Sequence, residues 1–234
     1  MAGERFYNKM TRKVVLTGHY GSGKTEIAVS LAMLLASGSA QKVSLVDLDI
    51  VNPYFRSRER RDLLKAVGVT IYGSAFKEES TMELPALGAG LRAPLEDSSC
   101  RVIVDVGGND SGALVLNQFT KYFTDSETTM LAVVNANRPD TRCLGGALMH
   151  IEAIEAVTGL EINGIVNNSH LLRETTAGTV IKGHELCREI SEATGKIIWC
   201  DCYPDGIVRP EDLPGLSERL LPLGMHMRPT WLDA

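Results

Sequence analysis

The sequence predicts an α/β fold: a doubly wound, mainly parallel sheet with helices on both faces, arranged as a Rossmann-like three-layer sandwich. Short apolar segments alternate along the chain with longer segments of helical periodicity, a pattern typical of βαβ units. The apolar segments are continuous rather than alternating, as expected where helices cover both faces of a sheet. The first apolar segment ends in a glycine-rich turn that leads into a helix.

The expected elements of the first half begin with a buried strand at 13–17 (KVVLT). A helix follows at 25–37, and Gly38 is a suitable C-cap for it. The segment 74–95 contains proline and glycine and receives no element. The remaining expectations are a helix at 58–67 and strands at 43–46, 69–72 and 102–106.

The second half repeats the alternation. Strands are expected at 130–134, 162–166 and 196–200, and helices at 141–157, 179–193 and, as a short element, near 211–220. The chain shows no internal repeat, low-complexity stretch or linker. A single domain over residues 1–234 is therefore expected.

Composition excludes several classes of protein. The 234 residues are 44% hydrophobic and 23% charged, as in ordinary globular domains, which excludes a disordered chain or a disulfide miniprotein. The formal net charge of −5 argues against a dedicated nucleic-acid-binding protein. An odd number of cysteines, the lack of a C-x-x-C pair and a polar N-terminus favour reduced thiols in a cytoplasmic protein. The longest uncharged window, 27–41, is too short to span a membrane.

The turn after the first strand matches the phosphate-binding pattern G-x-x-x-x-G-K-[ST] in full. Glycine lets closely spaced backbone N–H groups approach a phosphate. The lysine supplies a cation for the β- and γ-phosphates, the threonine hydroxyl can bind Mg²⁺, and the following helix adds its N-terminal dipole. The predicted phosphate-binding residues are Gly18, His19, Tyr20, Gly21, Ser22, Gly23, Lys24 and Thr25.

Carboxylates follow two other expected strands. Asp47 and Asp49 come at the end of the second strand, at the sheet edge where α/β folds bind ligands. The 102–106 strand carries Asp105 and leads into Gly107 and Gly108, which is a Walker B pattern. Asp105 is therefore expected to support Mg²⁺, and the two glycines let the backbone approach a γ-phosphate. We expect Gly108 to contribute to the nucleotide site.

These three segments resemble the P-loop ATPases of the MinD/ParA group, the class that also includes CobQ/CobB domains and the nitrogenase iron protein. The resemblance implies that Asp49 positions the attacking water and belongs with Thr25 and Asp105 to the metal site, while Asp47 steadies Lys24 or the metal shell. It also implies that Asn168 contacts the base. Pro204 and Asp205 are similar to a loop that closes over the base.

The sequence departs from this family at three places. His19 stands where MinD/ParA proteins carry a second, signature lysine, which bears on hydrolysis assisted by a partner subunit. The cysteines that bind the cluster of the iron protein have no counterparts after Asp105, so no iron–sulfur cluster is expected. The tail lacks the basic amphipathic helix of MinD, so no membrane partner is expected.

Other polar residues are weaker candidates. Arg138, just past the 130–134 strand, is a candidate for a nucleotide or partner contact. Cys200 and Cys202 are better explained as core residues than as metal ligands. Four arginines after the Asp-x-Asp segment suit an exposed helix face, with substrate binding as the alternative: Arg56, Arg58, Arg60 and Arg61.

The sequence therefore favours a Mg²⁺-dependent ATP-binding protein that hydrolyses ATP slowly. Segments 47–53 and 105–110 would act as a switch that a protein partner reads, and the resemblance implies a homodimer. ATP is expected rather than GTP because 167–170 (NNSH) lacks the aspartate of the guanine motif N-K-x-D. The alternatives are an ATP-dependent small-molecule kinase or ligase and, third, a GTP-dependent metal-insertion protein.

Overall fold

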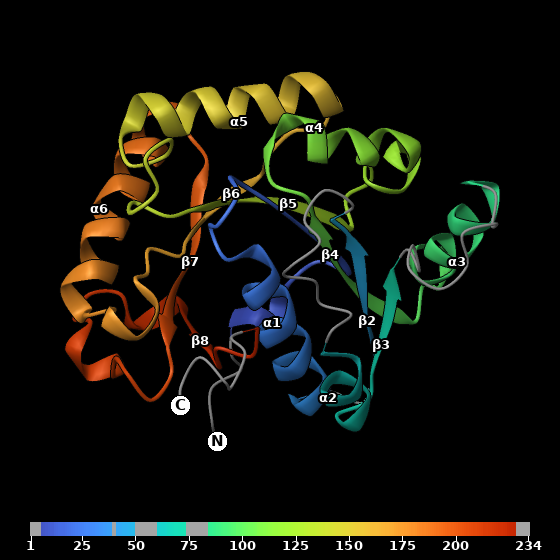
Figure 1. Cartoon of the computed structure of the whole chain (residues 1–234), viewed down its shortest axis with the longest axis horizontal. Coiled ribbons are helices and arrows are strands. Elements are labelled where there is room, and N and C mark those ends of the chain that lie inside the picture. Colours follow the sequence, from blue (N-terminus) through green and yellow to red (C-terminus); the bar gives the residue numbers. More distant parts are fainter. Residues whose placement is uncertain (1–5, 39–40, 50–59, 74–83, 228–234) are drawn as a thin grey trace.

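One eight-stranded sheet organises the chain (Figure 1). The structure is a computed structural model that describes residues 6–38, 41–49, 60–73 and 84–227. Its strand order is β3-β2-β4-β1-β5-β6-β7-β8, and every neighbouring pair is parallel. The α/β class and the parallel sheet are thereby confirmed.

The strands are β1 (Lys13–Thr17), β2 (Lys42–Leu48), β3 (Val69–Gly73), β4 (Cys100–Val106), β5 (Thr128–Val134), β6 (Gly164–Asn167), β7 (Ile197–Pro204) and β8 (Leu220–Leu223). The α-helices are α1 (Lys24–Gly38), α2 (Arg61–Ala66), α3 (Leu84–Glu96), α4 (Asn109–Ala113), α5 (Leu144–Thr158) and α6 (Ala177–Thr194). Short 3₁₀ turns occupy several of the connections between them.

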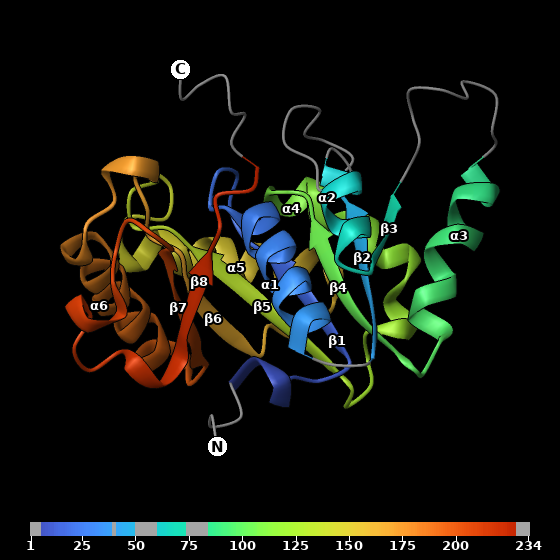
Figure 2. The same cartoon turned by 90° about the horizontal axis from the view of Figure 1, so that it is seen from below.

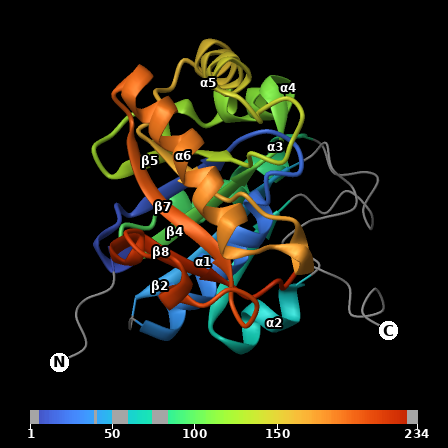
Figure 3. The same cartoon turned by 90° about the vertical axis from the view of Figure 1, so that its left-hand side faces the viewer.

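Helices cover both faces of the sheet, as the uniformly apolar strands predicted. Figure 1 shows α4 and α5 on one side and α1 and α2 on the other, and Figure 3 shows the same layers from the left-hand side. Each face has its own apolar cluster: β1 gives Val15 to the side of α5 and α6, and Val14 and Leu16 to the side of α1. All three side chains are buried, so the central strand has no solvent-exposed face.

The strand register brings the carboxylates of the two acidic motifs together. Asp105 of β4 pairs with Leu16 of β1 on one side and with Asp47 of β2 on the other. Because all strands are parallel, the glycine-rich loop after β1 and the turns after β2 and β4 leave from the same edge. Figure 2 shows that the segment after β8 runs beside α1 and also reaches this edge.

Several expected boundaries are corrected. The segment near 211–220 is no helix but two 3₁₀ turns, Pro210–Asp212 and Ser217–Arg219, followed by β8. Pro214 removes a helical N–H donor from the middle of this segment, and Leu221 is instead buried beside β7. The strand expected at 162–166 is β6, which begins at Gly164, and α5 begins at Leu144 rather than at 141.

Two helices lie where no element was expected. α3 occupies the end of the proline- and glycine-containing segment and holds Pro94 within its last turn. α4 follows Gly108 directly and is only five residues long. In the described part of the chain, no helix is long and apolar enough to cross a membrane. The residues between β3 and α3, and Arg56 and Arg58, lie outside the described residues.

Candidate functional site

Three glycines of the loop between β1 and α1 have backbone conformations that favour glycine. Gly18, Gly21 and Gly23 have φ angles of 140°, 73° and 86°, a region that L side chains rarely adopt. Space is equally restrictive, because a Cβ on Gly18 would lie 2.4 Å from the Val133 carbonyl oxygen. The loop therefore packs its backbone directly against the end of β5.

Lys24 lies folded into this loop. Its Nζ donates hydrogen bonds to the carbonyl oxygens of Gly18, at 2.8 Å, and His19, at 3.2 Å. Burial lowers the pKa of Lys24, whereas the nearby carboxylates of Asp105 and Asp49 oppose that shift. The loop thus contains a buried cation that faces two acidic side chains.

Asp105 is the most deeply buried of these acidic residues. Its side chain is fully buried, and neither carboxylate oxygen has a hydrogen-bond partner among the described residues. Burial, followed by the nearby Asp47 carboxylate, raises the pKa of Asp105 to about 8, and Lys24 opposes this shift. Asp47 accepts a hydrogen bond from the backbone N–H of Asp49 at 3.1 Å. The two acidic motifs of the sequence therefore form one cluster.

This cluster suits Mg²⁺. A buried carboxylate with free lone pairs is a hard oxygen ligand, and Mg²⁺ is usually held by one or two carboxylates, water and substrate phosphates. The described residues contain no group of three or more His, Cys, Asp or Glu side chains that could hold a metal ion unaided. Asp105 and its neighbouring carboxylates fit Mg²⁺ that is also bound by a phosphate.

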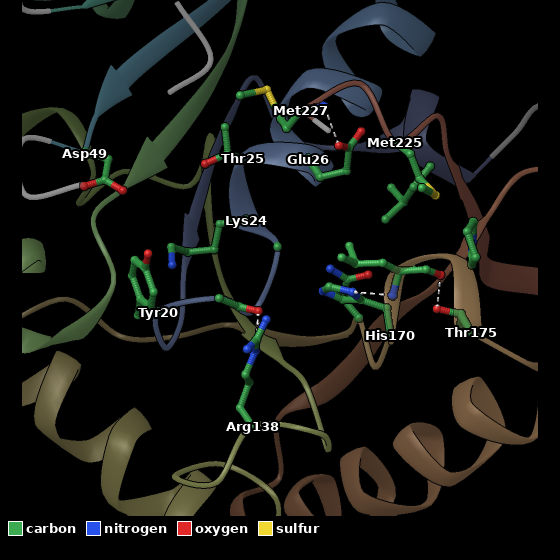
Figure 4. Close-up of a pocket in the computed structure, with 16 residues that line it drawn as sticks. Tyr20, Lys24, Thr25, Glu26, Asp49, Arg138, His170, Thr175, Met225 and Met227 are labelled. Atoms are coloured by element: carbon green, nitrogen blue, oxygen red, sulfur yellow. Dashed lines mark hydrogen bonds between the residues drawn. The ribbon is translucent and has the colours of Figure 1, made fainter. Parts of the chain in front are cut away.

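A cavity of about 290 Å³ opens beside the loop (Figure 4). Lys24, Thr25 and Asp49 line one end, and His170, Thr175 and Met225 line the other. Its further lining residues are Tyr20, Gly21, Gly23, Glu26, Arg138, Asn168, Leu172, Pro204, Leu223 and Met227. The cavity is thus charged near the loop and largely apolar away from it, which suits a phosphorylated ligand with a flat apolar moiety.

Asn168 connects the loop end of the cavity to its apolar end. Its Nδ2 donates a 2.7 Å hydrogen bond to the carbonyl oxygen of Ser22, and a Cβ on Gly23 would lie 2.3 Å from that nitrogen. The turn after β6 is therefore attached to the glycine-rich loop. His170 follows in this turn, and burial, aided by the charge of Arg138, lowers its pKa to about 4, so it is neutral at pH 7.

The predicted site residues divide into two groups. The predicted residues that line the cavity are Tyr20, Gly21, Gly23, Lys24, Thr25, Asp49, Asn168 and Pro204. The predicted residues that do not line it are Gly18, His19, Ser22, Asp47, Asp105, Gly108 and Asp205. Asp105 and Asp47 lie beneath the loop, whereas the exposed Asp205 accepts a hydrogen bond from the backbone N–H of Gly206. Pro204 is the last residue of β7 rather than part of the loop.

Glu26 is a residue that sequence reasoning missed. Its carboxylate accepts hydrogen bonds from the backbone N–H groups of His226, at 2.7 Å, and Met227, at 2.8 Å. These bonds hold the segment after β8 against the first turn of α1, and this segment brings Met225 and Met227 to the cavity. The pairing spans 200 residues of sequence, so no local pattern signals it.

Glu26→Ala is expected to lower the free energy of unfolding by about 1–3 kcal/mol, because the part-buried backbone N–H groups of His226 and Met227 lose a charged acceptor. Urea denaturation measures the effect. Glu189→Ala, which removes an exposed glutamate of α6, is the matched control and should stay within about 0.5 kcal/mol of the unaltered chain. Equal stability of both variants would show that the Glu26 contacts contribute nothing.

Comparisons with known proteins support the fold. No protein-family model matches the chain, and no curated protein matches its sequence. Cell division protein FtsY from Thermotoga maritima is similar over 80% of this chain and 59% of its own, with a TM-score of 0.54 and 17% identity. Signal recognition particle 54 kDa protein from Aeropyrum pernix in complex with GDP is similar over 81% and 41%, with a TM-score of 0.50 and 22% identity. The chain spans less than two thirds of either protein, and such identities show the fold alone.

Proposed function

We propose that this chain is a Mg²⁺-dependent ATP-binding protein with slow ATPase activity that acts as a nucleotide switch for a protein partner. The observation that carries the proposal is the cavity that joins the glycine-rich loop to an apolar end. A P-loop fold with a complete G-x-x-x-x-G-K-[ST] motif is built to hold a nucleoside triphosphate. We also propose that the chain belongs with the MinD/ParA group, that it forms a homodimer, and that residues 1–234 are a single domain.

Each polar residue of the loop end has a role in this proposal. Lys24 neutralises the β- and γ-phosphates, and the backbone of 18–25 cradles them. Thr25 and Asp105 would hold Mg²⁺, which neutralises charge that develops on the phosphates. Asp49 orients the attacking water, and Asp47 holds the Asp49 backbone through their 3.1 Å hydrogen bond. We propose that these groups hydrolyse ATP slowly, because His19 stands where MinD/ParA proteins carry a second lysine.

The segment after β4 provides the switch. A Cβ on Gly108 would lie 2.8 Å from the backbone nitrogen of Tyr20, and one on Gly107 would lie 3.1 Å from Asp49 Oδ1. The backbone at 107–108 therefore touches both the phosphate loop and the proposed water-positioning residue, and α4 begins immediately after it. A shift of this segment on loss of the γ-phosphate would move α4. Residues 50–53 of the other proposed switch segment lie outside the described residues.

The base end of the cavity favours adenine. Guanine recognition needs an acceptor, usually a carboxylate, for its N1–H and N2–H₂ donors. Among the described lining residues the carboxylates are Asp49, at the loop end, and Glu26, whose oxygens accept from backbone N–H groups. In the segment 167–170 (NNSH), His170 stands where N-K-x-D would place its aspartate. GDP is bound by the Aeropyrum protein named above, but the low identity transfers no base preference.

ATP is therefore expected to bind at least about tenfold more tightly than GTP, because a guanine would leave buried N–H donors without acceptors. Titration of the chain with each Mg-nucleotide under one set of conditions measures the ratio. Hydrolysis of both should be followed at saturation, to separate affinity from turnover. Equal or tighter GTP binding would contradict the adenine preference, and no binding of either would contradict the proposed function.

A further inference from the structure

Arg138 is fixed by a rigid turn after β5. Its backbone N–H donates to the carbonyl oxygen of Asn135 at 3.1 Å, and its own carbonyl oxygen accepts from Thr141 N–H at 3.1 Å. The Thr141 hydroxyl also donates to the Asn135 carbonyl oxygen, and both of these residues are buried. The turn therefore delivers the Arg138 side chain to a defined place at the carboxyl edge of the sheet.

The side chain lies across the glycine-rich loop (Figure 4). Arg138 Nε donates a 2.8 Å hydrogen bond to the Gly21 carbonyl oxygen. A Cβ on Gly21 would lie 2.8 Å from Arg138 Cζ and 2.9 Å from Nη2, so the guanidinium occupies the space that a side chain there would take. Glycine at position 21 is thus needed both for the turn of the loop and to leave room for the Arg138 guanidinium.

The outer face of the Arg138 guanidinium has no hydrogen-bond or ion-pair partner in the part of the chain that the structure describes. Among the three nitrogens of the guanidinium, Nε alone has a hydrogen bond with a described residue, and Nη1 and Nη2 have none. No carboxylate of the described residues forms an ion pair with it, and the nearby Asp140 lies 3.3 Å from His19 instead. Arg138 lines the same cavity as Lys24 and Thr25. A positioned cation with two free donors therefore faces the cavity.

We propose that Arg138 binds the polyphosphate of the nucleotide through Nη1 and Nη2. This inference rests on the proposed function and gives the site a second cation, supplied by the same chain, beside Lys24. A guanidinium with its Nε already bound is preorganised, so little side-chain entropy is lost when it meets an anion. Its fork also matches phosphate oxygens better than a lysine ammonium does.

The test compares Arg138→Ala and Arg138→Gln with Arg142→Ala, which removes an exposed arginine four residues away that does not line the cavity. Affinities for Mg·ATP and for adenosine are measured at two salt concentrations. Both Arg138 variants are expected to lose about tenfold or more in ATP affinity. Adenosine binding and the Arg142 variant should remain unchanged. The ATP affinity of the Arg138 variants should also depend less on salt, because one charge–charge contact is gone.

The salt series separates phosphate binding from support of the loop. If Arg138 only braces the loop through Gly21, the variants lose ATP affinity while its salt dependence stays as in the unaltered chain, and the inference is wrong. Unaltered ATP affinity of folded variants would also overturn it. In that case tight ATP binding by the unaltered chain would leave the proposed function intact. Failure of the unaltered chain to bind ATP would instead overturn both.

Discussion

Asp49→Asn is expected to slow single-turnover ATP hydrolysis at least about a hundredfold, because a neutral amide orients and polarises water less well than a carboxylate. ATP affinity should change by no more than about threefold, since the amide keeps the shape of the side chain. Rapid-quench hydrolysis and equilibrium titration on the same variant measure both quantities. Wild-type hydrolysis would refute the role of Asp49, whereas loss of ATP binding would place Asp49 among the metal ligands.

Asp105→Asn is the companion variant and separates metal binding from water positioning. It should also slow hydrolysis at least about a hundredfold, but with a higher Mg²⁺ concentration needed for half-maximal ATP binding. A Mg²⁺ titration at fixed ATP therefore distinguishes the two carboxylates. An unchanged Mg²⁺ requirement would remove Asp105 from the metal site.

The same variant should stabilise the chain when no ligand is present. The folded chain binds the Asp105 proton up to pH about 8, whereas the unfolded chain releases it near its ordinary pKa of about 4. Between these values the folded state holds more protons, so this group makes stability fall as pH rises. The asparagine side chain cannot ionise. The free energy of unfolding of Asp105→Asn should therefore exceed that of the unaltered chain by about 5 kcal/mol at pH 8 and by about 1–2 kcal/mol at pH 5. Urea denaturation at both pH values measures the difference.

Lys24→Ala is expected to lower Mg·ATP affinity about ten- to a hundredfold, because a charge-assisted contact to the phosphates is lost. Lys24 is the one lysine or arginine within 18–25, so the loop holds no substitute. Lys182→Ala, which removes an exposed lysine of α6, is the matched control. Unchanged ATP affinity in a folded Lys24→Ala chain would mean that the loop does not bind phosphate.

The parts of this structure that local sequence determines were predictable. The uniformly apolar strands required cover on both faces, and the glycine spacing of 18–25 required positive φ angles. The positions of Asp47 and Asp105 at strand ends predicted their proximity, because parallel strands bring their carboxyl ends to one edge. Within these limits, the loop end of the cavity follows from the sequence.

The apolar end of the cavity does not follow from it. Leu172 lies in the connection after β6, whereas Leu223 ends β8 and Met225 follows it, so their meeting depends on the path of β8. That path was missed because most residues of 211–220 are compatible with a helix, and the pairing of Leu221 with Cys202 of β7 outweighs this local preference. Glu26 was missed for the same reason: its hydrogen-bond partners lie at the other end of the chain.

The Glu26 contacts also bear on how long a nucleotide stays bound. Glu26 directly follows Thr25, so one turn of α1 carries a proposed metal ligand and the anchor of the wall that holds Met225 and Met227. Any outward motion of this segment must break the two hydrogen bonds from His226 N–H and Met227 N–H to Glu26. For a nucleotide that leaves past Met225 and Met227, contacts near residues 225–227 would thus add to those of the phosphate loop in setting the dwell time of the nucleotide.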